Sequence, residues 1–568
     1  MSLMKETEVQ HPQSSVAQQP VTSPWKKRCQ TVLLHLRNHT GVGMVCAVAY
    51  FDPGNWGVDL EAGSQYGYRL LFVVLLAGVF AIFFQSMASR MGCVTGLDLA
   101  SHCRLLLHSR PKHTMLWRWG VLYPLYLVSE IAIIATDLAE LLGSAIALCL
   151  LFPKLELWHG VLITAFDVII LLALGDPLRS RPLKLFEWFI GALVIAVFVC
   201  MCIIVSEVNI KWGHAFQGYL PSKYIIPNGA LYVSVGIIGA TVMPHSLFLG
   251  SALATQDRIS TSSHNAFLKE DQFSPTMSLT SNESGTITKE SSLTLVDRLR
   301  AVSFQAKQYF LSSFRVPPPS TFATRATCHS DRENNSLAFV NAHIYHGLVD
   351  VAVSLLGFAV VINSLILIIA GGVFYHGTVS SDGNKPAGLF EAYDLIRDLV
   401  GQGPATLFAV ALLAAGQSAS IIATVAGQAV SEGFLQWRVS PVIRRLLTRL
   451  LAVIPSMVVA IAMGKRGIDT LLVLSQVVLS IVLPFITLPL IYITSSKRFM
   501  SVKVPVSVSA LSSSTNGCES ETENGGEKTK DFSNHWVSTT IGWAIWLLVL
   551  VANVYVLTTV RKEVEDAD

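Results

Sequence analysis

The sequence predicts an all-α polytopic membrane protein, built from two inverted repeats of five helices and an eleventh helix after them. Its composition is the first reason, because 52% of the 568 residues are hydrophobic and only 14% are charged. Soluble domains carry about 25% charged residues. The second reason is that apolar stretches long enough to cross a bilayer recur along the chain. The third is that two of them, the first and the sixth, are interrupted by proline at matching places.

Eleven apolar stretches are expected to span the membrane, each as a helix of about 18 residues or more. In order they are 41–58, 69–89, 119–150, 158–175, 185–206, 229–254, 349–375, 404–430, 442–463, 469–494 and 536–559.

Basic residues gather in alternate connections between these stretches, which predicts the orientation of the chain. The amino-terminal tail and the loops after the second, fourth and eighth spans are rich in Lys and Arg, and the basic residues of the last of these include Arg449. The amino terminus is therefore expected in the cytoplasm and the carboxyl terminus outside. The plasma membrane and a vacuolar or endosomal membrane are both compatible with this pattern.

The chain divides into seven segments by composition. Two Ser/Thr-rich segments within the body are expected to be disordered cytoplasmic loops, because they cannot bury enough apolar surface to offset chain entropy. The segments are a disordered tail (1–40), the first five-helix repeat (41–206), an external loop with the sixth helix (207–256), the first loop (257–335), helices seven to ten (336–494), the second loop (495–535) and the eleventh helix with an external tail (536–568).

Several function classes are disfavoured by the sequence. A net charge of +3 without a long basic block does not indicate a nucleic-acid partner. The nine cysteines form no CxxC pair, and no GxxxxGK[ST] motif is present for ATP-driven pumping. We expect a protein that is not an enzyme and holds no cofactor.

The two interrupted spans carry the chemistry. Asp52 precedes Pro53 in the first, and Met243 precedes Pro244 in the sixth. Proline removes a backbone donor and unwinds a helix, and irregular backbone at membrane depth survives only where it lines a cavity or is buried. An intramembrane aspartate is costly unless it meets a cation or a proton. A carboxylate, an amide from Asn55, free carbonyls and a thioether together suit a divalent transition metal.

These motifs resemble those of a known family. Asp52-Pro53-Gly54-Asn55 and Met243-Pro244-His245 are similar to the two characteristic motifs of the Nramp family (natural resistance-associated macrophage proteins). Within it the chain looks most like the fungal manganese transporters. Other segments that carry the resemblance are Glu130–Glu140, Ala426-Gly427-Gln428, Arg444–Arg449 and Ser475–Ser480.

The resemblance implies a LeuT-like fold and proton-coupled symport of manganese, with iron as a second cargo, toward the cytosol. The metal and the proton are then cargo and coupling ion, and the partners are these ions and the lipid bilayer. The metal ligands that it implies are Asp52, Asn55, Met243, the backbone carbonyls of Ala49 and Ala240, and Gln476 in some conformations. This chain has Ser246 and Gly250 where many animal and bacterial members carry Asn and His, which affects expectations about proton handling rather than metal binding.

Three acids lie on one face of the third span, Glu130, Asp137 and Glu140. At about 100° per residue they fall within an 80° arc, so they are expected to face the bundle. Spacing alone leaves two equal alternatives, a structural charge network with Arg444 and Arg445 or stations for a proton. The resemblance implies the second, with the two arginines in the same route.

Two further polar residues have expected roles. His245 is assigned to proton handling rather than to the metal, and Asn363, in the middle of the seventh span, is expected to bind an unwound backbone segment. Two other functions are weighed against metal symport. One is an organic-substrate symporter on the same fold, which Asp52 and Met243 disfavour. The other is a non-transporting, Nramp-like metal sensor, which is disfavoured because the ligands are retained.

Overall fold

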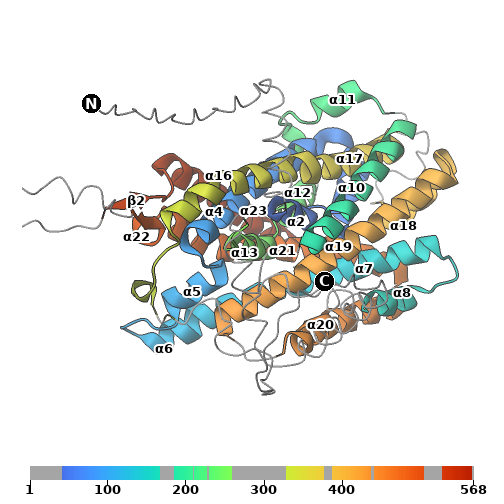
Figure 1. Cartoon of the computed structure of the whole chain (residues 1–568). Coiled ribbons are helices and arrows are strands. Elements are labelled where there is room, and N and C mark those ends of the chain that lie inside the picture. Colours follow the sequence, from blue (N-terminus) through green and yellow to red (C-terminus); the bar gives the residue numbers. More distant parts are fainter. Residues whose placement is uncertain are drawn as a thin grey trace, which may run out of the picture.

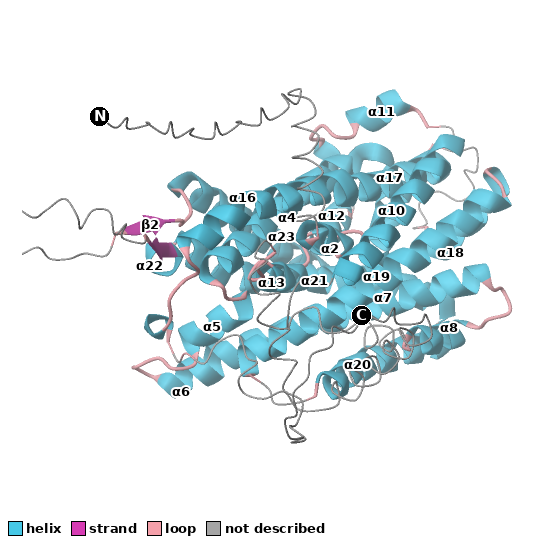
Figure 2. Ribbon diagram, viewed as in Figure 1, coloured by secondary structure: helices cyan, strands magenta, loops and turns pink. Residues whose placement is uncertain are grey.

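The computed structural model describes residues 41–166, 184–208, 210–226, 229–258, 326, 328–376, 387–436, 440–462, 464–504 and 528–565. Figure 2 shows that nearly all of this chain is helical. One antiparallel pair of short strands, β1 (Ser501–Lys503) and β2 (Thr529–Asp531), lies at one end of the bundle. The predicted all-α class is confirmed.

The first half of the chain contains the first broken helix, which consists of α2 (Val42–Val48) and α3 (Pro53–Tyr66). The elements after it are η1 (Gly67–Leu70), α4 (Leu71–Thr95), α5 (Leu99–Leu107), α6 (Thr114–Trp117), the π-helical turn η2 (Arg118–Leu122), α7 (Tyr123–Leu151), α8 (Leu157–Thr164) and α10 (Lys184–Glu207).

The second half repeats the pattern with a broken helix made of α12 (Ala230–Thr241) and α13 (Pro244–Leu253). Before it lie α11 (Trp212–Gln217) and η3 (Lys223–Ile225). After it come η5 (His329–Asp331), α16 (Leu337–Ser354), the π-helical turn η6 (Leu355–Val360), α17 (Val361–Ala370), the π-helical turn η7 (Gly371–Tyr375), α18 (Leu389–Leu399), α19 (Gln402–Leu435), α20 (Pro441–Ala462), α21 (Gly464–Ser495), α22 (Lys497–Met500) and α23 (Trp536–Glu565).

Within the described residues, eight helical stretches are long and apolar enough to cross a membrane, compared with the eleven predicted. One stretch, Pro53–Thr95, has 43 residues, about 65 Å of helix and twice the thickness of a bilayer core. It therefore holds two passes, which are separated at Gly67, where φ is +60°. The predicted ninth span appears as the shorter apolar helix Leu446–Ala462. The predicted fourth span is described only to Phe166, and the rest of it lies outside the described residues.

The two broken helices cross near the middle of the bundle, where α2 and α12 are labelled in Figure 1. α3 packs against α12 and α17, and α2 packs against α13 and α16. α7 and α19 run beside the first break, and Pro53 fits against two glycines. A Cβ on Gly143 would collide with the Pro53 ring, and one on Gly416 would lie 3.3 Å from it.

Parts of both loops expected to be disordered are ordered, which corrects the predicted boundaries. The last residues of the 257–335 segment dock on α4, since Asn335 Nδ2 donates to the Cys93 carbonyl (2.8 Å) and Arg332 Nη2 to the Gly96 carbonyl (2.8 Å). In the 495–535 segment, α22, β1 and β2 are formed, and Asn334 donates to the carbonyls of Phe499 and Ser501. Average composition missed this order because polar side chains that donate to backbone carbonyls, and a few buried apolar residues (Phe499, Met500 and Val502), hold the segments in place.

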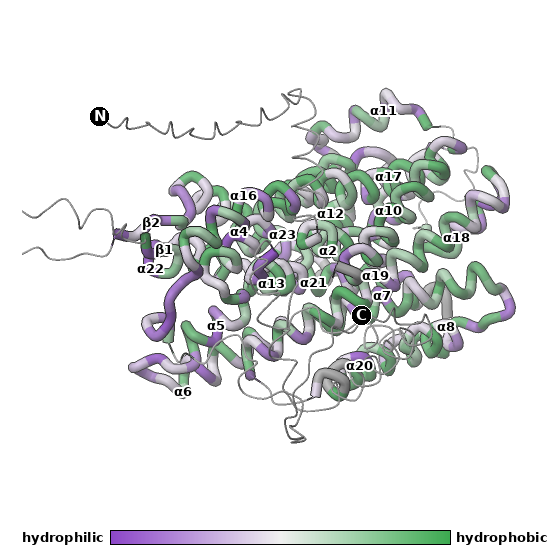
Figure 3. The backbone as a smooth tube through the Cα atoms, in the orientation of Figure 1, coloured by the Kyte–Doolittle hydropathy of each residue, from purple (hydrophilic) through white to green (hydrophobic). Residues whose placement is uncertain are grey.

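Hydropathy along the backbone agrees with a membrane protein. In Figure 3 the long helices are mostly green, and hydrophilic purple is prominent in segments that connect them, such as that near α5 and α6. The exposed side chains of α23 include Trp536, Leu547 and Val551. An apolar exterior of this kind is suited to lipid.

Candidate metal site

The two helix breaks follow directly from the positions of two prolines. Pro53 is four residues after Ala49, and Pro244 is four residues after Ala240. In a continuous helix each proline nitrogen would donate to the carbonyl four residues earlier, but proline has no N–H. The carbonyl oxygens of Ala49 and Ala240 are therefore released from the helical pattern. These are the two carbonyls that the family resemblance implies as metal ligands.

Two oxygens from the two breaks converge on one point. Asn55 Nδ2 donates to Asp52 Oδ1 (2.8 Å) and to the Ala240 carbonyl (2.9 Å). The amide therefore lies between a carboxylate of the first break and a carbonyl of the second. The NH₂ group of Asn55 donates to both oxygens. A cation in its position would contact the same two oxygens, because a cation and an N–H donor both carry positive charge.

Asp52 caps α3 and is completely buried. Its Oδ1 accepts a hydrogen bond from the backbone N–H of Asn55 (2.8 Å), as expected for an N-cap. Its Oδ2 is buried, and no group in the described part of the chain donates to it. A carboxylate oxygen without a donor in a buried site is costly unless a cation or a proton meets it.

Gln476 lies against both broken helices, and Met243 lies at the second break. The side chain of Gln476 lies against Gly54, where a Cβ would collide with its Nε2. Its backbone carbonyl lies against Gly239 in the other broken helix, and its Oε1 has no donor among the described residues. Met243 is the N-cap of α13 and is fully buried. The structure thus places the predicted ligands at the two breaks and on α21, which packs against both α3 and α12.

Asn363, on α17, forms hydrogen bonds with the first break. Its Nδ2 donates to the Tyr50 carbonyl (2.7 Å) and to Asn55 Oδ1 (3.2 Å). The prediction that Asn363 binds unwound backbone is confirmed. The same amide orients Asn55, so α17 contributes to the shape of the site without supplying a predicted ligand.

A network that the sequence did not predict lies beside the site. Tyr50 Oη donates to Gln85 Oε1 (3.0 Å), and Ser246 Oγ lies 3.1 Å from both of these oxygens. A Cβ on Gly250 would collide with Gln85 Nε2, so the amide fills the space that a larger residue would need. The two departures from the family pattern, Ser246 and Gly250, are therefore both accommodated by Gln85. The sequence signal was available, since Gln85 is a polar residue within an apolar span.

One of the acids of α7, Asp137, pairs with Arg449, which the prediction placed in a loop. Arg449 forms an ion pair with Asp137 and donates to Ser420, and its side chain is 3% exposed. Counting Arg449 with the loop was wrong, because it lies inside α20. Glu140 is fully buried and Glu130 is half-buried, so the expected inward face holds for two of the three acids.

Arg444 and Arg445 lie on the same helix, α20, but the positions of their side chains are outside what the structure describes. The expected network of these two arginines with the α7 acids therefore stays a prediction.

His245 lies next to the second break and is buried. Its Nδ1 is 3.4 Å from Thr136 Oγ1 on α7, one residue before Asp137. No described group bonds to its Nε2. His245 thus lies between the second broken helix and α7.

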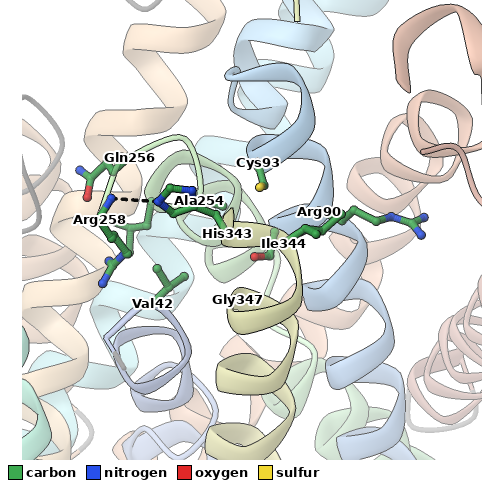
Figure 4. A pocket seen from close by; sticks show the side chains of 11 residues that line it. Val42, Arg90, Cys93, Ala254, Gln256, Arg258, His343, Ile344 and Gly347 are labelled. Atoms are coloured by element: carbon green, nitrogen blue, oxygen red, sulfur yellow. Dashed lines mark hydrogen bonds between the residues drawn. The ribbon is translucent and has the colours of Figure 1, made fainter. Parts of the chain in front are cut away.

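The amino-terminal end of α2 is tied to neighbouring helices. Asp350 Oδ2 on α16 accepts from the backbone N–H groups of Gly43 (2.7 Å) and Gly41 (3.3 Å). After α13, Arg258 pairs with Glu187 on α10 (2.7 Å), and its backbone N–H donates to His343 Nε2 (3.1 Å), the dashed bond in Figure 4. Asp52 is buried in this arrangement, so the site is closed to solvent.

The donor set is unusual for a resident metal. Among the described residues, no group of three or more His, Cys, Asp and Glu side chains is placed to hold a metal ion. The predicted set has one carboxylate, amides, two proline-released carbonyls and a thioether, so it carries a single full negative charge.

Comparison with known proteins identifies the family to which this site belongs. The sequence profile described as natural resistance-associated macrophage protein-like matches residues 43–280 and 318–513. The chain belongs to the Nramp family. It is 36% identical to the manganese transporter pdt1 of Schizosaccharomyces pombe, over 94% of this chain and 87% of that protein. It is 34% identical to the iron transporter SMF3 of Saccharomyces cerevisiae, over 93% and 96% of the two chains.

Nramp proteins from bacteria show the same likeness in sequence and fold. The divalent metal cation transporter MntH of Nostoc is 36% identical over 81% of this chain and 84% of that protein. A crystal structure of the Eremococcus coleocola manganese transporter, a mutant, superposes with a TM-score of 0.64 at 26% identity, covering 92% of this chain and 87% of that one. The Nramp fold, with its first and sixth helices discontinuous, is therefore the fold of this chain.

Proposed function

We propose that this protein is a proton-coupled symporter that moves a divalent transition metal, manganese with iron as a second cargo, toward the cytosol. The observation that carries the proposal is the convergence of Asp52 Oδ1 and the Ala240 carbonyl on Asn55 Nδ2. A cation that replaces the amide N–H groups there gains one full negative charge and a carbonyl dipole. Rotation of the Asn55 amide then presents its Oδ1 as a further ligand.

The thioether of Met243 favours transition metals over abundant hard ions. Calcium and magnesium prefer shells made entirely of oxygen, and magnesium gives up its waters reluctantly. Manganese, iron and cadmium tolerate or favour sulfur. An organic substrate would need a pocket of small residues in the place that Asp52 and Met243 fill.

Proton transfer is assigned to the buried groups that face α7. His245 is beside the metal site and reaches Thr136, and Asp137 is paired with Arg449 one residue further on. Because these groups lie on different helices from Asp52 and Asn55, the proton and the metal can take separate routes. Asp137→Asn is expected to leave manganese binding in place and to impair proton coupling.

The test is manganese uptake into vesicles that contain the purified protein, with and without an inward proton gradient. We expect uptake to accelerate with the gradient and the vesicle interior to acidify along with metal entry. Uptake that ignores the gradient would reject coupling, and absence of uptake with retained metal binding would favour a sensor. The orientation with the amino terminus in the cytoplasm is checked by protease access to the amino-terminal tail.

A further inference from the structure

A second carboxylate lies on α3 beyond the metal site. Asp59 is seven residues after Asp52 and is 2% exposed. Its Oδ2 is buried and receives no hydrogen bond from any part of the chain that the structure describes. Asp52, on the same face of α3, is a like charge that repels it. Asp59 has no place in the mechanism described above.

An ionised Asp59 without a partner lowers the stability of the folded protein. A buried carboxylate needs donors or an opposite charge, and inside a membrane protein an ionisable group without them is a functional site by default. A structural role would require a partner that holds the side chain, as Arg449 holds Asp137. Asp59 has the burial of a structural residue without the bonds of one.

The position of Asp59 on α3 gives its role. At 100° per residue, Asp52, Asn55, Asp59 and Tyr66 fall within an arc of about 60°. At 1.5 Å per residue, Asp59 is about 10.5 Å from Asp52 along the axis and about 10.5 Å from Tyr66. Tyr66 lines a pocket at the other end of α3, together with His214 and His376. One face of α3 therefore leads from this pocket to the metal site, and Asp59 lies halfway along it.

This face is closed between Asp59 and the pocket. Gly63, one turn after Asp59, meets the backbone of α17 and η7 so closely that a Cβ would lie 2.5 Å from the Leu367 carbonyl oxygen and 2.9 Å from Gly371 N. The contact falls where α17 changes to a π-helical turn, an irregularity that often accompanies a functional site. Separation of α3 from α17 at Gly63 would connect the pocket with Asp59 before it exposed Asp52.

We propose that Asp59 is a second binding station for the divalent metal, which the ion reaches from the pocket at Tyr66 before it moves on to Asp52. The proposal rests on the proposed function of metal uptake. A carboxylate halfway along the route attracts the dication into a narrow passage and shortens the distance over which it is without an anionic partner. Repulsion between Asp52 and Asp59 is relieved by the same ion as it arrives.

The test uses Asp59→Asn in the full chain, reconstituted in vesicles. The variant has nearly the same shape and removes a buried charge, so we expect it to fold. Loss of an attracting charge in a passage is expected to raise KM for manganese uptake about tenfold, at the low end of electrostatic focusing effects. The affinity of the central site, measured by calorimetry on purified protein, is expected to change less than about twofold, since Asp59 is not one of its ligands.

The matched control is Glu61→Gln. Glu61 lies on the opposite face of α3 from Asp52 and Asp59 and is bonded to Gln65 Nε2 (3.1 Å), so the variant removes the same charge from the other face of the same helix. We expect the KM of Glu61→Gln to stay at the wild-type value. Asp59→Glu keeps the negative charge, so its KM is expected to be close to that of the wild type.

The outcomes separate cleanly. An unchanged KM in Asp59→Asn, or a change in proton entry alone, would overturn the metal station. A parallel loss of equilibrium affinity would also overturn it, because Asp59 would then act on the central site. Wild-type vesicles that take up no manganese would instead overturn the proposed function.

Discussion

Removal of the charge of Asp52 without removal of its cap hydrogen bond is the sharpest test of the metal site. Asp52 has two roles, as the anionic oxygen at the break and as the N-cap of α3. Asn is as good an N-cap as Asp. Asp52→Asn therefore keeps the bond to the backbone of Asn55 and removes only the charge, whereas Asp52→Ala removes both.

The size of the effect follows from the burial of the site. Truncation of one partner of a buried charge interaction costs about 2–5 kcal/mol, and every 1.4 kcal/mol is tenfold in affinity. Manganese affinity of Asp52→Asn should therefore fall at least about 30-fold. The metal-free protein should not be destabilised, because the variant replaces an oxygen that has no donor in the described chain. Asp52→Ala should lose the cap as well, at about 1 kcal/mol.

The assay is calorimetric titration with manganese, combined with thermal unfolding of the metal-free proteins in detergent. Glu61→Gln serves as the charge control, since Glu61 faces away from the site. We expect wild-type affinity in the control, loss of binding in both Asp52 variants and a lower melting temperature only in Asp52→Ala. Manganese affinity of Asp52→Asn within threefold of wild type would refute the assignment of Asp52 as the anionic ligand.

Arg449→Met should lower the melting temperature more than the double variant that adds Asp137→Asn, because a buried carboxylate left without its arginine costs about 3–5 kcal/mol; equal melting temperatures would contradict the pairing. Met243→Ala should still transport manganese but should lose cadmium affinity and admit calcium, measured as competitive uptake; calcium exclusion that persists would leave the thioether a packing group only. The docked segment 328–335 should loosen as pH falls. Burial, with help from two neighbouring arginines, lowers the pKa of His329 from 6.5 to about 4. Between pH 6.5 and pH 4, His329 binds a proton when the segment is released but stays neutral when it is docked. The docked state is therefore fully stable above pH 6.5 and loses stability as pH falls toward 4. Hydrogen exchange at pH 7 and pH 5 measures this, and a flat profile would contradict it.

Much of the fold was predictable because the bilayer restricts the choices. Apolar length located the helices, and the two prolines located the breaks, since few other residues interrupt a buried helix. The family resemblance implied the carbonyls of Ala49 and Ala240 as ligands, and each of these residues lies four residues before a proline. These features are local in sequence, and local rules were sufficient.

What the sequence missed depends on contacts between distant segments. Arg449 resembled a loop residue because it follows a run of basic residues, and only its pairing with Asp137, 312 positions away, shows that it is buried. Gln85 lies within an apolar span, and its role follows from hydrogen bonds with Tyr50 in the first break and Ser246 on α13. The ordered ends of the two loops are held by polar side chains that donate to carbonyls of distant residues and, in the second loop, by a few buried apolar residues, which the average composition of a segment does not reveal.

The arrangement at the breaks also explains how a site can select an ion and still release it. Before the metal arrives, Asn55 Nδ2 satisfies both Asp52 Oδ1 and the Ala240 carbonyl. The incoming ion must displace these two hydrogen bonds, each with a net value of about 1 kcal/mol. The Asn55 amide therefore competes with the ion for the two oxygens and lowers the affinity of the site for the ion. When the ion leaves, the amide returns, so Asp52 Oδ1 and the Ala240 carbonyl both regain a donor in the empty state. A site of three or four carboxylates would bind more tightly but would have no neutral group able to take the place of the ion, and its empty state would be unstable at this depth. A single carboxylate with an amide as its internal substitute is therefore what a transport cycle requires here.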